Sequence, residues 1–431
     1  MSQPANKPEA TDTQPVSAAP QERRGLWRPL AVRDFRLLWF GEGISLLGDQ
    51  FYLVALPWLT LQLTGSGLAL GTVMMAAAIP RAALMLVGGA ASDRLAPRAL
   101  MIWSNAVRGI VVSTIALLVF FGSIHLWHLY VTAVVFGLAD AFFYPAFTSM
   151  VPKLLDPDHL IAGNSLLQGT AQLNVLIGPA PAGLIIASAG IAAALGFDAV
   201  TFLFAIFMLV MIRGGRQPAH VEGAAAPTTK RAGLLSSISE GLRYAWADPV
   251  TRAIVLIIAA INLCVFGPFM VGLAALADKR FTQGAAGFGT MLSAWGGGAL
   301  VGTLIGGSFG TPTRRGLRLV GVAAVLGIGL ALIGVMPNVF AASIVIAVMA
   351  LGSGFLNVGM MAWLQTRTEP RMLGRVMSLL MFAAVGLAPL SYVVSGALVD
   401  LNPTILFAAA GGIVLLVAML SIANKTVRTI D

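Results

Sequence analysis

The sequence predicts an all-α membrane protein with twelve transmembrane helices in two six-helix bundles. Hydrophobic residues make up 58% of the chain and charged residues only 10%, and the mean hydropathy is +0.87. A soluble core cannot bury so much apolar surface. The apolar residues also form repeated runs of about 20 residues, each long enough to cross roughly 30 Å of hydrocarbon. Such runs form helices, because a lone helix satisfies its own backbone within lipid.

The spans follow from the apolar runs taken in order, six in each half of the chain. We expect helices at 37–61, 68–91, 99–121, 129–150, 165–187, 191–212, 251–275, 285–308, 317–336, 339–361, 373–397 and 402–423.

These spans divide the chain into five regions. The prediction is a disordered cytoplasmic tail at 1–35, the first bundle at 36–212, a cytoplasmic linker at 213–250, the second bundle at 251–424 and a short cytoplasmic tail at 425–431. The first tail is rich in Pro, Ala and Gln and has no apolar core, which is typical of disorder rather than of a signal peptide. In the linker, apolar residues between Leu235 and Trp246 recur at helical spacing, which predicts a helix lying on the membrane surface.

The basic residues predict the orientation, because cytoplasmic loops of inner-membrane proteins collect Lys and Arg. The loops on one side contain Arg33, Arg36, Arg94, Arg98, Lys153, the basic residues from 213 to 252, Arg314, Arg315, Arg318, those from 367 to 375, Lys425 and Arg428. The loops on the other side contain only Lys279 and Arg280. We therefore expect an inner-membrane protein with both termini in the cytoplasm. Because the positive charge is spread over many short loops, anionic lipid is the expected partner and nucleic acid is not.

Several kinds of chemistry lack the residues they need. Cys264 is the single cysteine, so neither an intrachain disulfide nor a cysteine-rich metal site is expected. The four histidines have no metal-ligand spacing, and no phosphate-binding loop for ATP is present. We expect no metal, no cofactor and no enzymatic activity, and an ion or solute gradient as the energy source.

Internal repeats relate the two halves, as is common in transporters. The segment GTVMMAAAIPRAALMLVGGAAS from Gly71 resembles GTMLSAWGGGALVGTLIGGSFG from Gly289, and DPDHLIAGNSLL from Asp156 resembles EPRMLGRVMSLL from Glu369. These matches pair the second span with the eighth and the fifth with the eleventh.

Two motifs connect the chain with a known family. GGAASDRLAPR, after the second span, resembles the major facilitator signature GxLaDRxGRr at Gly89, Asp93, Arg94 and Arg98, while NVLIGPAPAG resembles the antiporter signature GxxxGPxxGG at Gly178, Pro179 and Gly183. The chain thus resembles the major facilitator superfamily, specifically the drug-efflux branch with macrolide and siderophore exporters. The resemblance covers nearly the whole chain after Arg33. It implies the major facilitator fold and alternating access with proton antiport.

The resemblance implies a gate at Gly89, Asp93, Arg94, Arg98 and Gly374. Asp93 lies at a cytoplasmic helix end, where it can accept hydrogen bonds from the free amides that begin the eleventh span near Gly374. The alternative is a loop turn with solvated charges. In the fifth span, Gly178 and Pro179 are expected to interrupt the helix.

Ionisable residues inside the spans are the candidates for ion coupling, since a charge at the bilayer centre costs roughly 3 kcal/mol or more unless it faces protein or water. They are Glu42, Asp49, Arg81, Arg108 and Asp140, all in the first half. Glu42 and Asp49 lie two turns apart on one helix face. Either the acids carry transported protons, or the two arginines neutralise them in a permanent structural network.

Polar residues in other spans are the candidates for substrate contacts: Gln168, Gln172, Asn174, Asn262, Asn357 and Tyr392. Hydrogen bonding between neighbouring helices is the alternative role for each of them.

The sequence therefore predicts a monomeric, proton-linked exporter of hydrophobic or amphipathic small molecules, with its binding site between the two halves. A solute uptake permease, a lysophospholipid transporter and a non-transporting membrane sensor remain as alternatives.

Overall fold

The computed structural model describes residues 25–214, 246, 249–308, 315–367, 383 and 386–423, and within these ranges every regular element is a helix. The first half comprises η1 (Arg28–Ala31), α1 (Arg33–Thr64), α2 (Gly67–Arg94), α3 (Pro97–Phe120), α4 (Leu126–Leu154), η2 (Pro157–His159), α5 (Leu160–Ile177), α6 (Pro179–Ala189) and α7 (Ile191–Met211). The second half comprises α9 (Pro249–Gly267), η3 (Pro268–Gly272), α10 (Leu273–Lys279), α11 (Gly284–Ser308), α12 (Arg315–Ile333), α13 (Val339–Arg367), α15 (Ala388–Leu401) and α16 (Pro403–Ala423).

The predicted membrane fold is confirmed. Among the described residues, eleven helical segments are long and apolar enough to cross a membrane, and α15 is a shorter apolar helix. Eleven of the twelve expected spans correspond to these long segments, and α15 covers 388–397 of the expected span at 373–397. The earlier part of that span lies outside the described residues, apart from 383 and 386–387. Several helices extend beyond the predicted apolar runs, as α1 does at both ends, because a helix continues into its polar flanks where water and headgroups begin.

Local sequence sets the tight turn between α1 and α2. Gly65 ends α1 with φ 63°, a left-handed conformation that favours glycine. The Ser66 hydroxyl then accepts a hydrogen bond of 3.2 Å from the Ala69 amide and caps α2. Two residues thus reverse the chain and start the next helix.

Proline interrupts two of the spans. α5 ends at Ile177 and α6 begins at Pro179, so the break falls at the Gly178–Pro179 dipeptide. In the seventh span, a π-helical turn begins at Pro268 between α9 and α10. Proline lacks the amide hydrogen that the helical ladder needs, which explains both positions.

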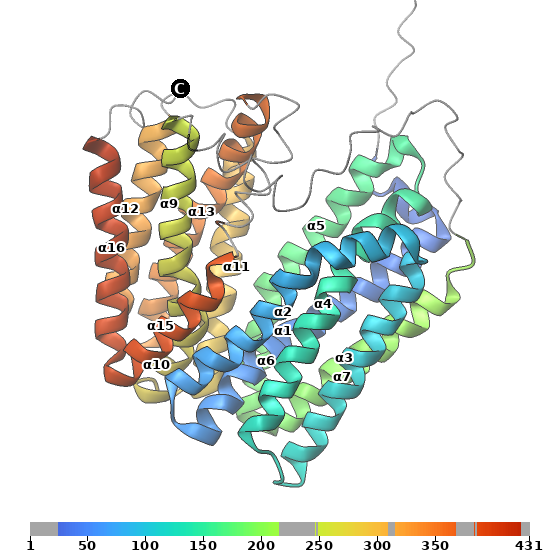
Figure 1. The fold of residues 1–431 in the computed structure, drawn as a ribbon, viewed down its shortest axis with the longest axis horizontal. Coiled ribbons are helices and arrows are strands. Elements are labelled where there is room, and N and C mark those ends of the chain that lie inside the picture. The colour runs from blue at the N-terminus through green and yellow to red at the C-terminus, as the bar shows by residue number, and fades with distance from the viewer. Residues whose placement is uncertain are drawn as a thin grey trace, which may run out of the picture.

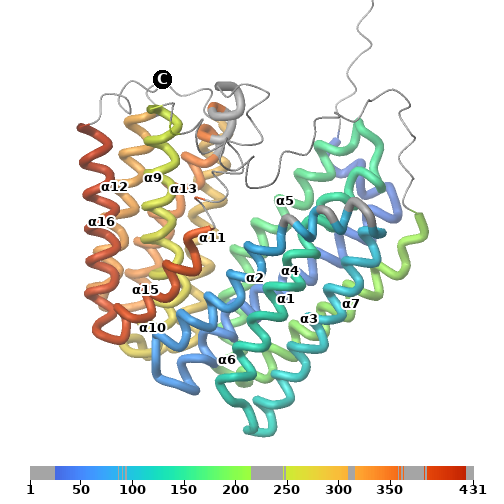
Figure 2. Tube along the Cα trace, viewed as in Figure 1, coloured from blue at the N-terminus to red at the C-terminus, as the bar shows by residue number. Residues whose placement is uncertain are grey.

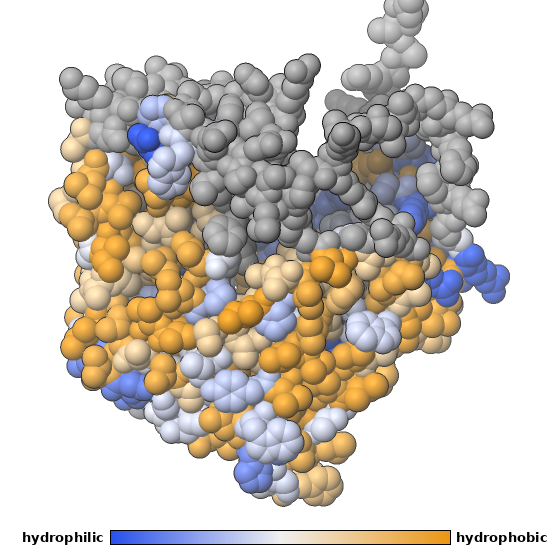
Figure 3. All heavy atoms as spheres, viewed as in Figure 1, coloured by the Kyte–Doolittle hydropathy of each residue, from blue (hydrophilic) through white to orange (hydrophobic). Residues whose placement is uncertain are grey.

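The helices form two bundles, α1 to α7 and α9 to α16, which meet at one end and diverge towards the other (Figures 1 and 2). We call these the closed end and the splayed end. The closed end carries the connections at 65–66, 121–125, 190, 280–283, 334–338 and 402, and the splayed end carries those at 95–96, 155–156 and 212. Apolar side chains dominate the visible outer surface of both bundles below the splayed end (Figure 3), as a protein surrounded by lipid requires.

Glycines bring the two bundles into close contact. A Cβ atom at Gly71 of α2 would collide with the Tyr392 carbonyl of α15, and one at Gly289 of α11 would collide with the Pro179 carbonyl of α6. At Gly296, further along α11, it would lie 2.5 Å from the Val175 carbonyl oxygen of α5. These contacts lie between the closed end and the middle of the helices. Small residues allow such close approach of helix backbones.

Some predicted features lie outside the described residues. They include most of the linker at 213–250 with its surface helix, the first tail up to residue 24, the second tail and Gly374. Trp246, the described residue of the linker helix, is helical and 50% exposed.

Candidate functional site

Arg108 of α3 lies at the centre of a charged cluster inside the first bundle. Its side chain is 2% exposed. The guanidinium carbon lies 4.3 Å from the ring centre of Phe143 on α4 and 4.8 Å from that of Phe202 on α7. These aromatic faces stabilise a buried cation through their ring quadrupoles. The packing fixes the guanidinium where α3, α4 and α7 converge.

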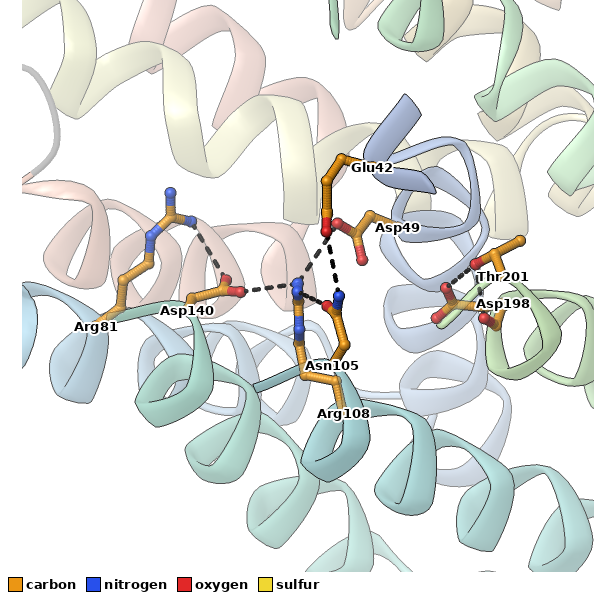
Figure 4. Close-up of polar contacts among 8 residues, drawn as sticks. All are labelled: Glu42, Asp49, Arg81, Asn105, Arg108, Asp140, Asp198 and Thr201. Atoms are coloured by element: carbon orange, nitrogen blue, oxygen red, sulfur yellow. Dashed lines mark hydrogen bonds and ion pairs between the residues drawn. The ribbon is translucent and has the colours of Figure 1, made fainter. Parts of the chain in front are cut away.

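Two carboxylates share this one guanidinium. The Nη1 atom of Arg108 donates a hydrogen bond of 3.3 Å to Oδ1 of Asp140, and it lies 3.6 Å from Oδ2 of Asp49 (Figure 4). Arg81 of α2 reaches the other side of Asp140, with Nη1 3.9 Å from Oδ2. The side chains of Asp49 and Asp140 are 26% and 30% exposed, whereas that of Arg81 is 52% exposed. The cluster therefore extends from a buried cation to a solvent-accessible one.

Asn105 links Glu42 to the same cluster. Its carbonyl oxygen accepts a hydrogen bond of 2.6 Å from Nη2 of Arg108, and its amide donates one of 3.4 Å to Oε1 of Glu42. Glu42 is 1% exposed, and its Oε2 atom has no hydrogen-bond partner among the described residues. Glu42 thus contacts the arginine only through the amide of Asn105.

A fourth carboxyl group, Asp198 of α7, is fully buried beside α1. Its Oδ1 atom accepts a weak hydrogen bond of 3.5 Å from the Thr201 hydroxyl, and its Oδ2 atom has no partner in the described part of the chain. Gly48 makes room for this group, since a Cβ atom there would lie 2.6 Å from Oδ1 of Asp198. Figure 4 places Asp198 and Thr201 to one side of the Arg108 network.

The cluster contains more carboxyl groups than cations. It has four carboxyl groups, those of Glu42, Asp49, Asp140 and Asp198, and two guanidinium groups, those of Arg81 and Arg108. Each guanidinium balances the charge of one carboxylate, and the ion pairs involve Asp49 and Asp140. The remaining carboxyl groups need protons or a cationic guest, because an unbalanced buried charge is costly. A site of this kind can exchange protons or bind charged solutes. Among the described residues, no group of side chains is suited to hold a metal ion.

Comparison with known proteins identifies the family. The model of the Major Facilitator Superfamily matches residues 38–390. The chain belongs to this superfamily. As a member with this many apolar helices, it is a multi-pass membrane transporter.

Curated relatives within the superfamily align over most of the chain. The multidrug efflux pump Tap of Mycobacterium tuberculosis is 30% identical over 84% of this chain and 86% of its own length. Macrolide efflux protein A of Streptococcus pyogenes is 20% identical over 92% of this chain and 97% of its own. The enterobactin exporter EntS of Shigella boydii is 25% identical, with 79% of each chain covered.

A solved structure supports the superfamily fold independently of close sequence similarity. A bacterial homologue of the iron transporter ferroportin, crystallised in an inward-facing state, matches with a TM-score of 0.69 at 16% identity, over 91% of this chain and 98% of the other.

The superfamily gate motif is only partly described. Arg98 donates hydrogen bonds of 2.8 and 2.7 Å to the carbonyl oxygens of Leu209 and Val210, so it caps the carboxyl end of α7 within its own bundle. A Cβ atom at Gly89 would meet no atom within 4 Å. Asp93 and Arg94 end α2, but their side chains are not described. Gly374 lies outside the described residues, so the Asp93 gate remains a prediction.

The residues that resemble the antiporter signature pack against α1 and against the second bundle. A Cβ atom at Gly183 would collide with the Ala285 carbonyl of α11, and one at Gly178 would lie 2.6 Å from Cβ of Gln50 on α1. The Ala180 amide, one residue after Pro179, donates a hydrogen bond of 3.0 Å to the Ser293 hydroxyl of α11. This break in the fifth span therefore touches both α1 and the second bundle.

The candidate substrate residues do not form one cluster. Asn174 donates to the Gly43 carbonyl at 2.8 Å, Asn262 donates to the Ile258 carbonyl of its own helix at 2.8 Å, and Gln172 reaches the Gly296 carbonyl across the bundle interface at 3.4 Å. Asn174 and Gln172 thus join neighbouring helices, which is the alternative role expected for such amides, whereas Asn262 bonds only within α9. The other three are Gln168 and Asn357, which are exposed, and Tyr392, which is half-buried.

Two members of the cluster, Asp198 and Asn105, were not predicted from the sequence. Asp198 lies within the predicted span at 191–212, so the criterion that selected the other acids also selects this one. Asn105 is uncharged and falls outside that criterion. Its only sequence signal is its position three residues before Arg108, which places both side chains on one face of α3.

Proposed function

We propose that this transporter exports hydrophobic or amphipathic small molecules, such as drugs or siderophore-like compounds, in exchange for protons. Support for the substrate class comes from the relatives, whose names describe multidrug, macrolide and enterobactin export. The names of these three relatives do not favour the alternative functions of an uptake permease, a lysophospholipid transporter or a sensor. The protein is proposed to work as a monomer in the inner membrane with both termini in the cytoplasm.

The observation that carries the proton part is the sharing of Arg108 by Asp49 and Asp140, at 3.6 and 3.3 Å. Arg81 also lies 3.9 Å from Asp140, but two cations balance at most two of the four carboxyl groups in the cluster. A proton on one of the acids therefore lowers the energy of the site. Both acids are partly exposed, which gives protons a path. When one acid binds a proton, Arg108 pairs with the other. This change of partner is a discrete local event that can bias the packing of α1 against α4.

The proposed transport cycle uses the two ends of the bundle. The orientation expected from the basic residues places the splayed end at the cytoplasm and the closed end outside. The described contacts between bundles lie on the closed side, so the conformation in hand receives substrate from the cytoplasm. Export then requires the closed end to open and the splayed end to close.

The test is transport by purified protein in proteoliposomes, with a radiolabelled macrolide as the probe. We expect a pH gradient to drive accumulation by the parent protein. Asp49→Asn and Asp140→Asn imitate a permanently protonated acid, so each should lose most of the uphill accumulation while keeping passive counterflow. Asp278→Asn is the matched control, because Asp278 is an exposed acid on α10 far from the cluster in sequence.

The result that contradicts proton coupling is full pH-driven accumulation by both single variants and by the double variant. Loss of counterflow together with a lowered melting temperature would instead assign the acids to a permanent structural network. If the macrolide is not transported, a siderophore-like catechol compound is the second probe.

A further inference from the structure

A carboxylate of the second bundle binds the first turn of a helix in the other bundle. Asp400, near the end of α15, accepts hydrogen bonds from the Gly67 amide at 2.6 Å, from the Leu68 amide at 3.0 Å and from the Ser66 hydroxyl at 2.8 Å. These partners begin α2, more than 330 positions away in the sequence. The junction lies at the closed end, where the ribbons of α2 and α15 run side by side (Figure 1).

The chemistry of this contact is that of a helix cap supplied by another helix. The first amides of α2 have no acceptor within their own helix, and the partial positive charge at a helix start attracts an anion. Hydrogen bonds that involve an ionised group are shorter and about twice as strong as neutral ones. Asp400 therefore supplies the hydrogen-bond acceptors and the negative charge that the start of α2 lacks. It does so only while the two bundles are in contact.

The backbones are shaped for this contact. A Cβ atom at Gly67 would collide with Cγ1 of Val399, and one at Gly396 would collide with the Gly67 carbonyl. Glycine at both positions lets α2 and α15 approach until the carboxylate reaches the amides. The contact thus depends on the close approach of the two helix backbones, and not on the length of the Asp400 side chain.

The basic side chains Lys279 and Arg280 at this end bond within their own bundle. Lys279 donates to the Val399 carbonyl at 3.4 Å, and Arg280 donates to the Gly334 carbonyl at 2.6 Å and to the Thr404 hydroxyl at 3.1 Å. Lys279 places a positive charge beside Asp400 without crossing to α2. Among the hydrogen bonds described at the closed end, those of Asp400 are the ones in which a charged group joins the two bundles.

The second junction of the closed end is neutral. α6 and α11 meet through glycines and through the hydrogen bond from the Ala180 amide to the Ser293 hydroxyl. α6 ends in Ala189, whereas α15 carries Asp400 at the corresponding end. The pairing of a carboxylate with a helix start is therefore found at one of the two junctions.

We propose that Asp400 is a latch that holds the closed end shut by capping α2, and that release of its three hydrogen bonds is required before this end opens. The inference rests on the alternating-access part of the proposed function, and it assigns a residue to a gate that the sequence motifs leave unassigned. It also gives α2 a role at both ends, since Asp93, the predicted gate residue of the splayed end, ends the same helix.

The test is a distance measurement between spin labels on the two bundles, in lipid nanodiscs at one pH and without substrate. In a Cys264→Ser background, the exposed positions Ser123 and Pro337 receive labels as Ser123→Cys and Pro337→Cys. We expect Asp400→Asn to raise the ratio of open to closed distances about tenfold, which corresponds to about 1.4 kcal/mol. Asp278→Asn removes the same charge from the same end and should leave the ratio unchanged.

A milder variant keeps the test decisive if Asp400→Asn folds poorly. Ser66→Ala removes one of the three bonds, together with the cap that the Ser66 hydroxyl provides to the Ala69 amide within α2. It should shift the same ratio in the same direction by a smaller factor. Unchanged distances in both variants, or equal shifts in Asp400→Asn and Asp278→Asn, would overturn the latch. A shift in distances with no pH-driven transport in the parent would leave the latch intact and contradict the proposed coupling. If no variant or condition ever yields open distances, alternating access itself is wrong.

Discussion

Arg108 donates a hydrogen bond of 3.3 Å to Asp140, and its donating nitrogen also lies 3.6 Å from Asp49. The guanidinium therefore ties α3 to α4 and to α1 at one point, and it sits between two aromatic rings with 2% of its surface exposed. A cation held in this way stabilises the bundle only as long as a carboxylate stays ionised beside it.

Removal of this cation should destabilise the protein strongly. Arg108→Gln leaves partly buried carboxylates without a balancing charge, which costs about 3 to 5 kcal/mol. Arg81→Gln is the matched control, because a half-exposed ion pair contributes about 1 kcal/mol or less. Thermal unfolding in detergent compares the two. The combination of Arg108→Gln with Asp140→Asn should recover part of the loss, and equal melting temperatures for the two single variants would refute this account.

The predicted gate at the splayed end is open to the same kind of measurement. Asp93→Asn should weaken the bond between the carboxylate and the amides near Gly374 by about 1 to 2 kcal/mol, which favours the form with the splayed end open. Spin labels at Asn164→Cys on α5 and Ser308→Cys on α11 report the distance. Asp34→Asn, an acid at the same end that accepts from the Gly214 amide at 3.0 Å, is the control. Identical distance distributions for Asp93→Asn and parent would remove Asp93 from the gate.

Close packing within the second bundle should depend on Gly302. A Cβ atom there would collide with the Leu351 carbonyl of α13, so Gly302→Ala must push α11 away and should cost about 1 to 3 kcal/mol. At Gly321 of α12 an added Cβ would meet no atom within 4 Å. There alanine should be neutral or slightly stabilising, because it is the better helix former. The melting temperatures of the two variants test this prediction. A lower melting temperature for Gly321→Ala than for Gly302→Ala would contradict it.

The proposed orientation makes the closed end accessible from outside the cell. Lys279→Cys in a Cys264→Ser background should react with an impermeant thiol reagent in intact cells, because Lys279 is exposed at that end. Lys153→Cys, near the splayed end, should react only after the cells are broken. The reverse pattern would invert the topology.

Local sequence by itself determined the approximate positions of the spans, the break at Gly178–Pro179 and the set of charged candidates. Hydropathy over about 20 residues is a property of one segment, and Gly65, Ser66 and Pro179 act on the backbone next to them. Gly298, Gly302 and Gly306 are spaced four residues apart and therefore share one face of α11. Each of these glycines faces a carbonyl group of α13. The presence of Glu42, Asp49, Arg81, Arg108 and Asp140 inside spans needed no structure either.

Only the tertiary structure decided which of these groups meet. The partition of Arg108 between Asp49 and Asp140, the bridge through Asn105 and the position of Asp198 beside Gly48 all depend on how α1, α3, α4 and α7 pack. The contact of Asp400 with the start of α2 depends on two bundles that are joined through a long linker. Hydrogen bonds and ion pairs act over about 3 to 4 Å, and sequence periodicity fixes the face of a helix but not the neighbour that this face will touch.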